Sequence, residues 1–173
     1  SSDIEYGLTF FNRNYSSGGS NNDGGRVVNA VKPKGTTHAD DIFSKIDAVT
    51  ASTNTPLCET LYEVSRYFGG LSVVYGDDDG TIGPSRDLGA ESPSGTYSSP
   101  ITPGCRDQVY IILMTDGAPT QDSAANSAVS SLPNADSSKR YSFASGGSTQ
   151  TSYLPVLSHW MARNDINPSV VGR

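Results

Sequence analysis

Several features that would narrow the function are scarce or missing. The 173 residues include only two cysteines, two methionines and one tryptophan. Lys and Arg number 12 against 18 Asp and Glu, which gives a formal net charge of -6. Without a basic stripe to neutralise phosphates, the balance argues against nucleic-acid binding. No stretch approaches the roughly 18 apolar residues that a membrane span needs, and the first residues have no signal-peptide pattern.

The length corresponds to one domain. Hydrophobic residues make up 35% of the chain, below the share in a typical globular domain, so we expect a core with much of the remaining length in polar loops. Because the chain starts with Ser1 rather than Met, residues 1–173 are expected to be a partial domain from the interior of a longer protein. A loop-rich insertion is predicted at about 69–107, and loops of this length are usually functional or mobile.

Residues 109–117, Val-Tyr-Ile-Ile-Leu-Met-Thr-Asp-Gly, form the most apolar run of the chain. Such a run, rich in β-branched and aromatic residues, is typical of a central parallel strand buried on both faces. A buried helix segment is the alternative, but a turn cluster ends the run after too few residues for a helix. Ligands of open α/β sheets bind outside the carboxyl ends of the strands, where Thr115 and Asp116 fall. A carboxylate there indicates a cation-binding or catalytic role.

Strand and helix patterns alternate along the rest of the chain, which indicates a layered α/β fold. Residues 4–12 and 26–31 are predicted strands, residues 122–132 and 152–163 are predicted helices, and polar loops are predicted at 15–25 and from about 133 to 151. Two further helices are expected to begin at the N-caps Thr37 and Thr55. Their apolar faces comprise Ile42, Phe43, Ile46 and Val49 in the first and Leu57, Leu61, Val64 and Phe68 in the second. Pro56 suits the first helical position, and Gly69 and Gly70 end the second helix.

Thr55 and Asp116 are the candidate metal ligands. In a doubly wound fold the helix that starts at Thr55 and the strand that ends at Asp116 would meet at the ligand-bearing edge of the sheet. A hydroxyl and a carboxylate suit Mg²⁺, which prefers oxygen ligands and keeps several waters. The alternative is that Thr55 only caps its helix and Asp116 only opens a turn.

Two motifs resemble von Willebrand factor A domains. Residues 54–68, which begin Asn-Thr-Pro-Leu-Cys-Glu-Thr-Leu, resemble the Thr-Pro-Leu helix of these domains, and residues 109–120 resemble their metal-site strand and turn. The closer resemblance is to the A domain of the PilC/PilY family of type IV pilus tip proteins. That family has a Thr-Pro-Leu-rich helix, a variable insertion, a Cys before the strand and a Thr-Asp-Gly-x-Pro-Thr turn in this order. Residues 6–12 and 154–165 also resemble their counterparts there.

The resemblance implies a von Willebrand A-type, Rossmann-like fold with helices on both faces of the sheet, here lacking its first and last strands. It also implies a metal-ion-dependent adhesion site (MIDAS), in which an Asp-x-Ser-x-Ser motif, a Thr and an Asp hold a divalent cation. An acidic group of the partner completes the coordination shell. Thr55 and Asp116 match the second and third elements, but the sequence contains no Asp-x-Ser-x-Ser. Mg²⁺ or another divalent cation is therefore expected only if that segment is supplied from elsewhere.

The function that the resemblance implies is that of an adhesion or pilus-biogenesis module, not of an enzyme. The expected location is the bacterial cell surface or pilus tip, reached through the periplasm. The expected partners are pilus subunits (minor pilins), a host or abiotic surface ligand, and the rest of the same polypeptide. A structural tip component with a non-functional metal site is the alternative.

An enzymatic alternative rests on the acidic run at residues 77–81. Behind Leu-Ser-Val-Val-Tyr, this run resembles the nucleophile motif of haloacid-dehalogenase-type phosphohydrolases, with Asp77 attacking phosphorus and Asp79 as the acid/base. However, Gly76 interrupts the strand, and no acidic pair follows to hold the metal. As a Ca²⁺ loop the run fails because Arg86 occupies the twelfth position. A solvated surface turn is the favoured interpretation.

Cys58 and Cys105 flank the polar insertion. They are either buried thiols or a disulfide. We favour the disulfide because a covalent cross-link stabilises a fold most when it closes a long loop such as this one. Closing the loop would contribute roughly 4 kcal/mol on the chain-entropy estimate. A bridge would indicate an oxidising compartment.

Overall fold

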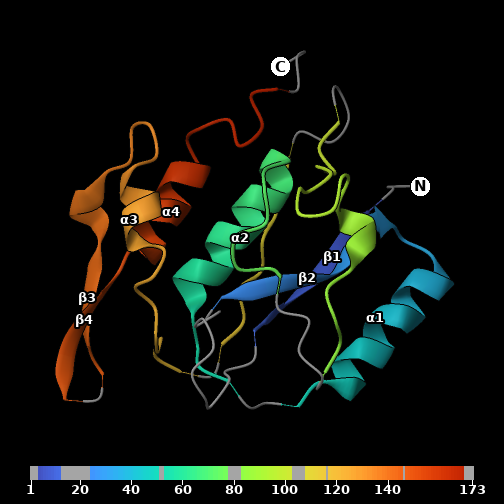
Figure 1. Ribbon diagram of the computed structural model, residues 1–173, viewed down its shortest axis with the longest axis horizontal. Coiled ribbons are helices and arrows are strands. Elements are labelled where there is room, and N and C mark those ends of the chain that lie inside the picture. The colour runs from blue at the N-terminus through green and yellow to red at the C-terminus, as the bar shows by residue number, and fades with distance from the viewer. Residues whose placement is uncertain are drawn as a thin grey trace.

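The computed structural model describes residues 4–12, 24–50, 53–77, 83–102, 108–115, 117–145 and 147–169. Its elements are β1 (Glu5–Phe11), β2 (Gly25–Pro33), α1 (Thr36–Ala48), α2 (Leu57–Gly69), the 3₁₀ helix η1 (Leu88–Ala90), α3 (Asn126–Ser130), the 3₁₀ helix η2 (Ser137–Lys139), β3 (Tyr141–Ser145), β4 (Ser148–Ser152) and α4 (Leu154–Met161). Helix α2 runs through the middle of the molecule (Figure 1). The hairpin of β1 and β2 and helix α1 lie on one side of it, and α3, α4, β3 and β4 lie on the other.

The described strands form two separate antiparallel hairpins, in which β1 pairs with β2 and β3 pairs with β4. The predicted von Willebrand A-type layered sheet is therefore wrong, and the architecture is mixed α/β. An alternation of strand and helix patterns does not determine which strands pair or in which direction. Here each strand pairs with its neighbour in the chain, which gives antiparallel ladders.

Residues 109–115 are not a strand, so the prediction of a central strand buried on both faces is also wrong. Tyr110, Ile112 and Met114 are 86%, 87% and 80% exposed, whereas the alternate residues Ile111 and Leu113 are 37% and 39% exposed. The segment thus rests on the helices with one set of side chains and turns the other set outward. An apolar run is buried only where another element covers it. No strand within the described part of the chain pairs with residues 109–115.

Strand β2 is buried along most of its length, and the predicted strand at 26–31 is confirmed. Its backbone is held by side chains of the flanking helices. The Val31 N–H donates to Tyr67 Oη of α2 at 2.9 Å, and Lys45 Nζ of α1 donates to the Val28 carbonyl at 2.7 Å. At Gly25 an added Cβ would lie 2.5 Å from Thr60 Cγ2, so α2 approaches the strand too closely for a side chain there.

Helix α2 is the centre of the core, with ten of its thirteen residues buried, so every side of it is in contact with other parts of the chain. The helix starts after Pro56, not after Thr55, and no side chain of the preceding residue caps it. A distant residue does so instead: the Cys58 N–H donates to Asp122 Oδ1 at 2.5 Å. The predicted glycine stop is confirmed, because Gly70 adopts the left-handed conformation (φ 64°) that ends many helices.

Helix α1 covers less of the core than its sequence predicts. It begins at Thr36 after Gly35, so Thr37 lies inside the helix and is not its cap. Of the predicted apolar face only Ile42 is buried, while Phe43, Ile46 and Val49 are 63%, 44% and 40% exposed. The helix lies at one side of the molecule in Figure 1, where the β1–β2 hairpin is its main neighbour.

Helices α3 and α4 pack on the opposite side of α2. Val129 of α3 and Val156 and Leu157 of α4 are fully buried against α2. The β3–β4 hairpin that precedes α4 was missed, because its strands are rich in Ser and Thr and were predicted as loop. Asn126 joins the hairpin to α3: its Nδ2 donates to the Thr151 carbonyl at 2.6 Å, and its Oδ1 accepts from the Tyr153 N–H at 3.0 Å.

Part of the predicted insertion packs against the body of the protein. The Asp87 N–H donates to the Val27 carbonyl of β2 at 2.8 Å, and Asp87 Oδ2 accepts from the Ala30 N–H at 2.9 Å. Arg86 pairs with Glu91 at 3.2 Å within the same loop. Residues 84–90 therefore lie against β2.

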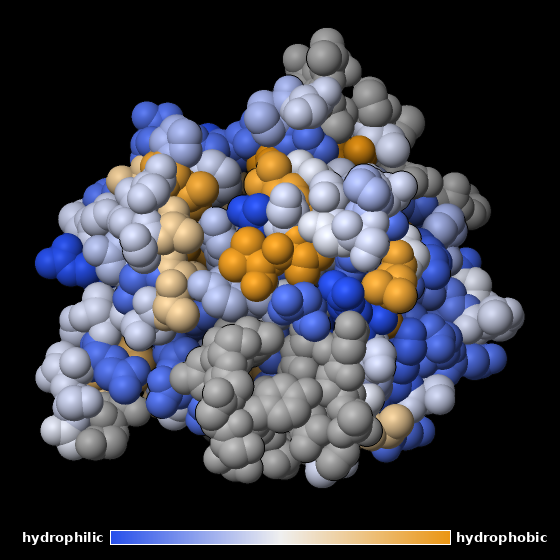
Figure 2. Space-filling view, in the orientation of Figure 1, coloured by the Kyte–Doolittle hydropathy of each residue, from blue (hydrophilic) through white to orange (hydrophobic). Residues whose placement is uncertain are grey.

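The surface carries hydrophobic groups in several places, and Figure 2 shows separate hydrophobic patches among hydrophilic atoms on one face. The exposed large hydrophobic residues include those of α1 and the outward side chains of residues 110–114. In the part of the chain that the structure describes, every helix is too short or too polar to span a membrane.

Candidate functional site

Thr55 and the turn after the apolar segment meet at the N-terminal end of α2. The Thr55 N–H donates to Thr120 Oγ1 at 2.8 Å, and the Thr120 N–H donates to the Thr55 carbonyl at 3.1 Å. The Gly117 N–H donates to Thr115 Oγ1 at 3.3 Å. The two motifs that carry the resemblance are thus adjacent in space, although Thr55 and Thr120 are 65 residues apart in sequence.

Asp116 lies outside the described residues, so its pairing with Thr55 stays a prediction. The Thr55 hydroxyl makes no hydrogen bond within the described part, because its contacts with Thr120 use backbone atoms. Among the described residues, no three His, Cys, Asp or Glu side chains are grouped so that they could hold a metal ion. With no Asp-x-Ser-x-Ser in the sequence, Thr55 is the one expected element of the adhesion site among the described residues. They do not by themselves fit a bound Mg²⁺, which needs six oxygen ligands.

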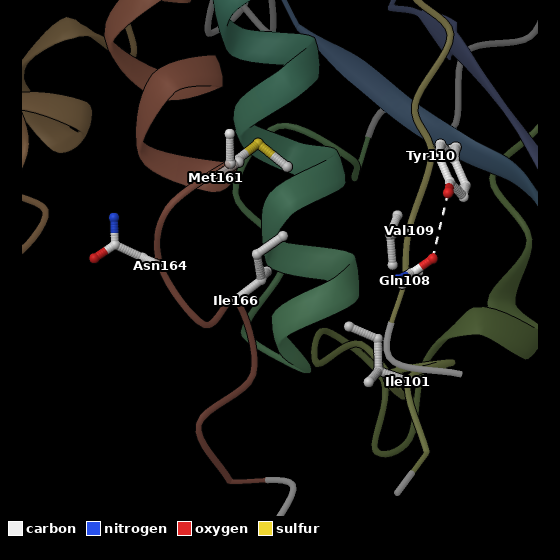
Figure 3. A pocket seen from close by; sticks show the side chains of 8 residues that line it. Ile101, Gln108, Val109, Tyr110, Met161, Asn164 and Ile166 are labelled. Atoms are coloured by element: carbon white, nitrogen blue, oxygen red, sulfur yellow. Dashed lines mark hydrogen bonds between the residues drawn. The ribbon is translucent and has the colours of Figure 1, made fainter. Parts of the chain in front are cut away.

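The inward side chains of the apolar segment line a groove against α2 and α4. One wall of the groove consists of Val109, Ile111 and Leu113. The other wall consists of side chains from α2, α4 and the turn after α4: Leu61, Leu154, Ser158, Met161, Ala162 and Ile166. An adjoining hollow opens between the start of the segment and the turn after α4 (Figure 3), where Met161 and Ile166 face Val109 and Ile101. The Tyr110 hydroxyl donates to Gln108 Oε1 at 3.3 Å beside this hollow. Both depressions are lined by uncharged side chains, so they suit apolar groups.

The backbone of residues 109–114 has no hydrogen-bond partner within the described part of the chain. Backbone N–H and C=O groups are strong donors and acceptors that are paired in most folded segments. An apolar segment with unpaired backbone groups is a template for pairing with another strand. The segment therefore combines an apolar surface with a row of directional donors and acceptors.

Two buried acids lie behind this surface at the start of α2. Glu59 Oε1 accepts from the Ala125 N–H at 3.0 Å, and Asp122 Oδ1 accepts from the Cys58 N–H. Both side chains are fully buried. Burial is the largest cause that raises the pKa of Glu59, to about 8, and the neighbouring charge of Asp122 adds to it.

One turn further along α2, Glu63 anchors the loop at residues 72–77. Its carboxylate accepts from the Tyr75 N–H at 2.9 Å, the Val74 N–H at 3.1 Å and the Tyr97 hydroxyl at 2.7 Å. Burial raises the pKa of Glu63, while these three donors lower it. Neither Glu59 nor Glu63 is a predicted site residue. Their spacing of four residues places them on one helix face, but the sequence did not indicate that loops would bury that face.

The remaining candidate residues are the two cysteines and the aspartates of the acidic run. Cys58 is buried, and burial raises the pKa of its thiol. Cys58 is a free cysteine among the described residues, and Cys105 lies outside them, so the disulfide stays a prediction. Asp77 is exposed. Asp79 also lies outside the described residues, and the phosphohydrolase motif is therefore untested.

Comparisons of the chain with protein-family models, with curated proteins and with solved structures found no match.

Proposed function

We propose that the chain is a binding module, not an enzyme, and that it takes an extended strand of a polypeptide partner onto residues 109–114. The observation that carries this proposal is that one segment combines exposed apolar side chains with backbone groups that have no partner among the described residues. On the motif resemblance, the module belongs to a type IV pilus tip or biogenesis protein at a bacterial surface. Pilus subunits are then among its expected partners.

A polypeptide strand fits the segment better than a small apolar ligand does. A small molecule would cover side chains but leave the N–H and C=O groups of the segment unpaired. An added strand lies about 4.8 Å away, pairs with these groups and sets its alternate side chains beside Tyr110, Ile112 and Met114. Because the segment is uncharged, strands with apolar alternation and no buried charge are favoured.

The test uses a displayed library of nonapeptides selected on the immobilised protein. Enriched peptides are expected to alternate apolar residues, and the synthetic form of one of them should slow amide hydrogen exchange at residues 109–114. Ile112→Pro removes one backbone donor and should abolish binding, whereas Ile112→Thr keeps the backbone and a strand-forming side chain and serves as the matched control. Peptides that bind Ile112→Pro as tightly as the original protein would contradict the proposal.

The role of a divalent cation is tested separately by calorimetric titration of MgCl₂. The chain alone should show no saturable binding, because its described residues supply too few ligands. A longer polypeptide that includes an Asp-x-Ser-x-Ser segment should bind one cation. Thr55→Ala and Asp116→Ala should each abolish this binding, and Thr37→Ala should not. Failure of the longer polypeptide to bind would favour the structural tip component over the metal-dependent adhesin.

A further inference from the structure

Two carboxyl groups in the core each leave one oxygen without a donor. Glu59 lies in the first turn of α2 and Asp122 in the turn before α3, and both are fully buried. The Ala125 N–H occupies Glu59 Oε1, and the Cys58 N–H occupies Asp122 Oδ1. Glu59 Oε2 and Asp122 Oδ2 are buried and have no donor within the described part.

Two adjacent carboxylates in a core repel each other and also lose their hydration, so they do not both remain charged without a counter-ion. A proton between them removes one charge and supplies the donor that both free oxygens lack. We propose that Glu59 Oε2 carries a proton that it donates to Asp122 Oδ2. The resulting carboxyl–carboxylate hydrogen bond joins the start of α2 to the turn before α3 and is broken by alkali.

The proton is assigned to Glu59 because Asp122 has the better site for a negative charge. Asp122 Oδ1 receives the Cys58 N–H at the N-terminal end of α2, where unpaired N–H groups and the helix dipole stabilise an anion. Glu59 Oε1 instead accepts from the Ala125 N–H in the turn before α3. Burial, and then the charge of Asp122, raises the pKa of Glu59 to about 8, in agreement with this assignment.

The other titratable groups around the pair do not supply a positive charge. On α2 these are Cys58, Tyr62 and Glu63. From the following loop Tyr75 faces the pair, and burial raises the pKa of both Cys58 and Tyr75, which keeps them neutral. Helix α3 contributes no titratable side chain, and His159 of α4 is on the surface.

The sign of the pH dependence follows from the raised pKa of Glu59. Below the unfolded-state pKa of about 4.5, both states hold the proton. Between about 4.5 and 8, only the folded state holds it, so the unfolding equilibrium constant should rise about tenfold per pH unit from this group. The stabilisation is fully present below the unfolded pKa and is lost as the pH rises through the folded pKa.

The experiment measures urea unfolding between pH 5 and 9 in the original protein, Glu59→Gln, Asp122→Asn and the exposed-charge control Asp47→Asn. Glu59→Gln keeps an oxygen for the Ala125 N–H and offers an amide N–H to Asp122 Oδ2, so it mimics the protonated acid. It should remove the tenfold-per-unit slope, which Asp47→Asn should retain. An unchanged slope in Glu59→Gln would overturn the proposal.

A direct measurement covers the case in which a variant does not fold. Side-chain carbon NMR of Glu59 in the original protein should titrate with a midpoint near pH 8, and a midpoint near 4 to 5 would overturn the proposal. A divalent cation is the competing occupant of the two free oxygens. If MgCl₂ or CaCl₂ raises the unfolding midpoint at pH 7, and both Glu59→Gln and Asp122→Asn abolish this rise, then a cation and not a proton lies between the two acids.

Discussion

Replacing Glu63 with alanine is expected to destabilise the protein by about 3–5 kcal/mol, which is typical when one member of a buried charged network is removed. The change leaves the Val74 and Tyr75 N–H groups and the Tyr97 hydroxyl without their acceptor. A hydrogen bond to a charged group contributes about 1.5–3 kcal/mol, so three of them sum to roughly 4.5–9 kcal/mol. The burial that raises the pKa of Glu63 opposes this sum, and the expected loss is therefore smaller.

Two milder changes test the same reasoning in parts. Glu63→Gln keeps one oxygen for the Tyr75 and Val74 N–H groups and can donate to Tyr97 Oη, so a loss of about 1–2 kcal/mol is expected. Tyr97→Phe removes only the phenol donor and should cost about 2 kcal/mol. The loss should be largest in Glu63→Ala, which removes all three hydrogen bonds, whereas Tyr97→Phe removes one and Glu63→Gln replaces charged hydrogen bonds with neutral ones.

The assay is urea unfolding followed by circular dichroism, with the midpoint and the slope fitted separately. Asp47→Asn is the control for Glu63→Gln, because it removes the same charge from the exposed end of α1 and should change stability by less than about 0.5 kcal/mol. A loss below about 1 kcal/mol in Glu63→Ala, with an unchanged slope, would show that Glu63 does not anchor the loop.

Three further outcomes are expected. Gly76→Ala places a Cβ 2.3 Å from Tyr97 Oη and should cost about 1–3 kcal/mol in urea unfolding, whereas Gly117→Ala meets no atom within 4 Å and should be neutral; equal losses would contradict this. Ile112→Asp should reduce binding of an apolar dye and leave stability within about 0.5 kcal/mol, and a clearly lower unfolding midpoint would instead place this side chain in the core. Because burial raises the pKa of the Cys58 thiol, iodoacetamide at pH 8 should label it only after unfolding, as read by mass spectrometry; rapid labelling of the folded protein would refute its burial.

The elements that the sequence predicted correctly are those whose signals are local. The glycines at the end of α2, the predicted strand at 4–12 and the predicted helix at 152–163 depend on signals within a few residues, and the structure confirms the end of α2, strand β1 and helix α4. The cap of α2 was mistaken because it is not local. The start of α2 is capped by Asp122, which is 64 residues away in sequence.

The apolar run at 109–117 shows why burial cannot be read from hydrophobicity alone. The side chains of Ile112 and Met114 have the character of a core strand, yet they face solvent because no described strand lies beside them. The same is true of Phe43 in α1, an apolar side chain of the predicted buried face that is exposed. In both cases the sequence pattern produces an apolar surface, but the described helices and strands do not cover it.

For the candidate site, the sequence predicts that Thr55 and Asp116 meet, and this stays a prediction because Asp116 lies outside the described residues. The structure does show that Thr55 hydrogen-bonds to Thr120 of the second motif. The fold expected to cause that meeting, a layered parallel sheet, is absent from the described part. The buried pair of Glu59 and Asp122 was missed because a carboxylate in a helical pattern is indistinguishable from a solvated one until its neighbours are known.

The central position of α2 has a consequence for how the chain comes apart. Segments that precede and follow it in the chain hydrogen-bond to it, among them β2 at Val31 and the later residues Val74, Ser99 and Ala125. If a protease cuts one connection, one fragment will contain α2 and the other fragment will remain hydrogen-bonded to that helix. They should migrate together on a sizing column and separate only in denaturant.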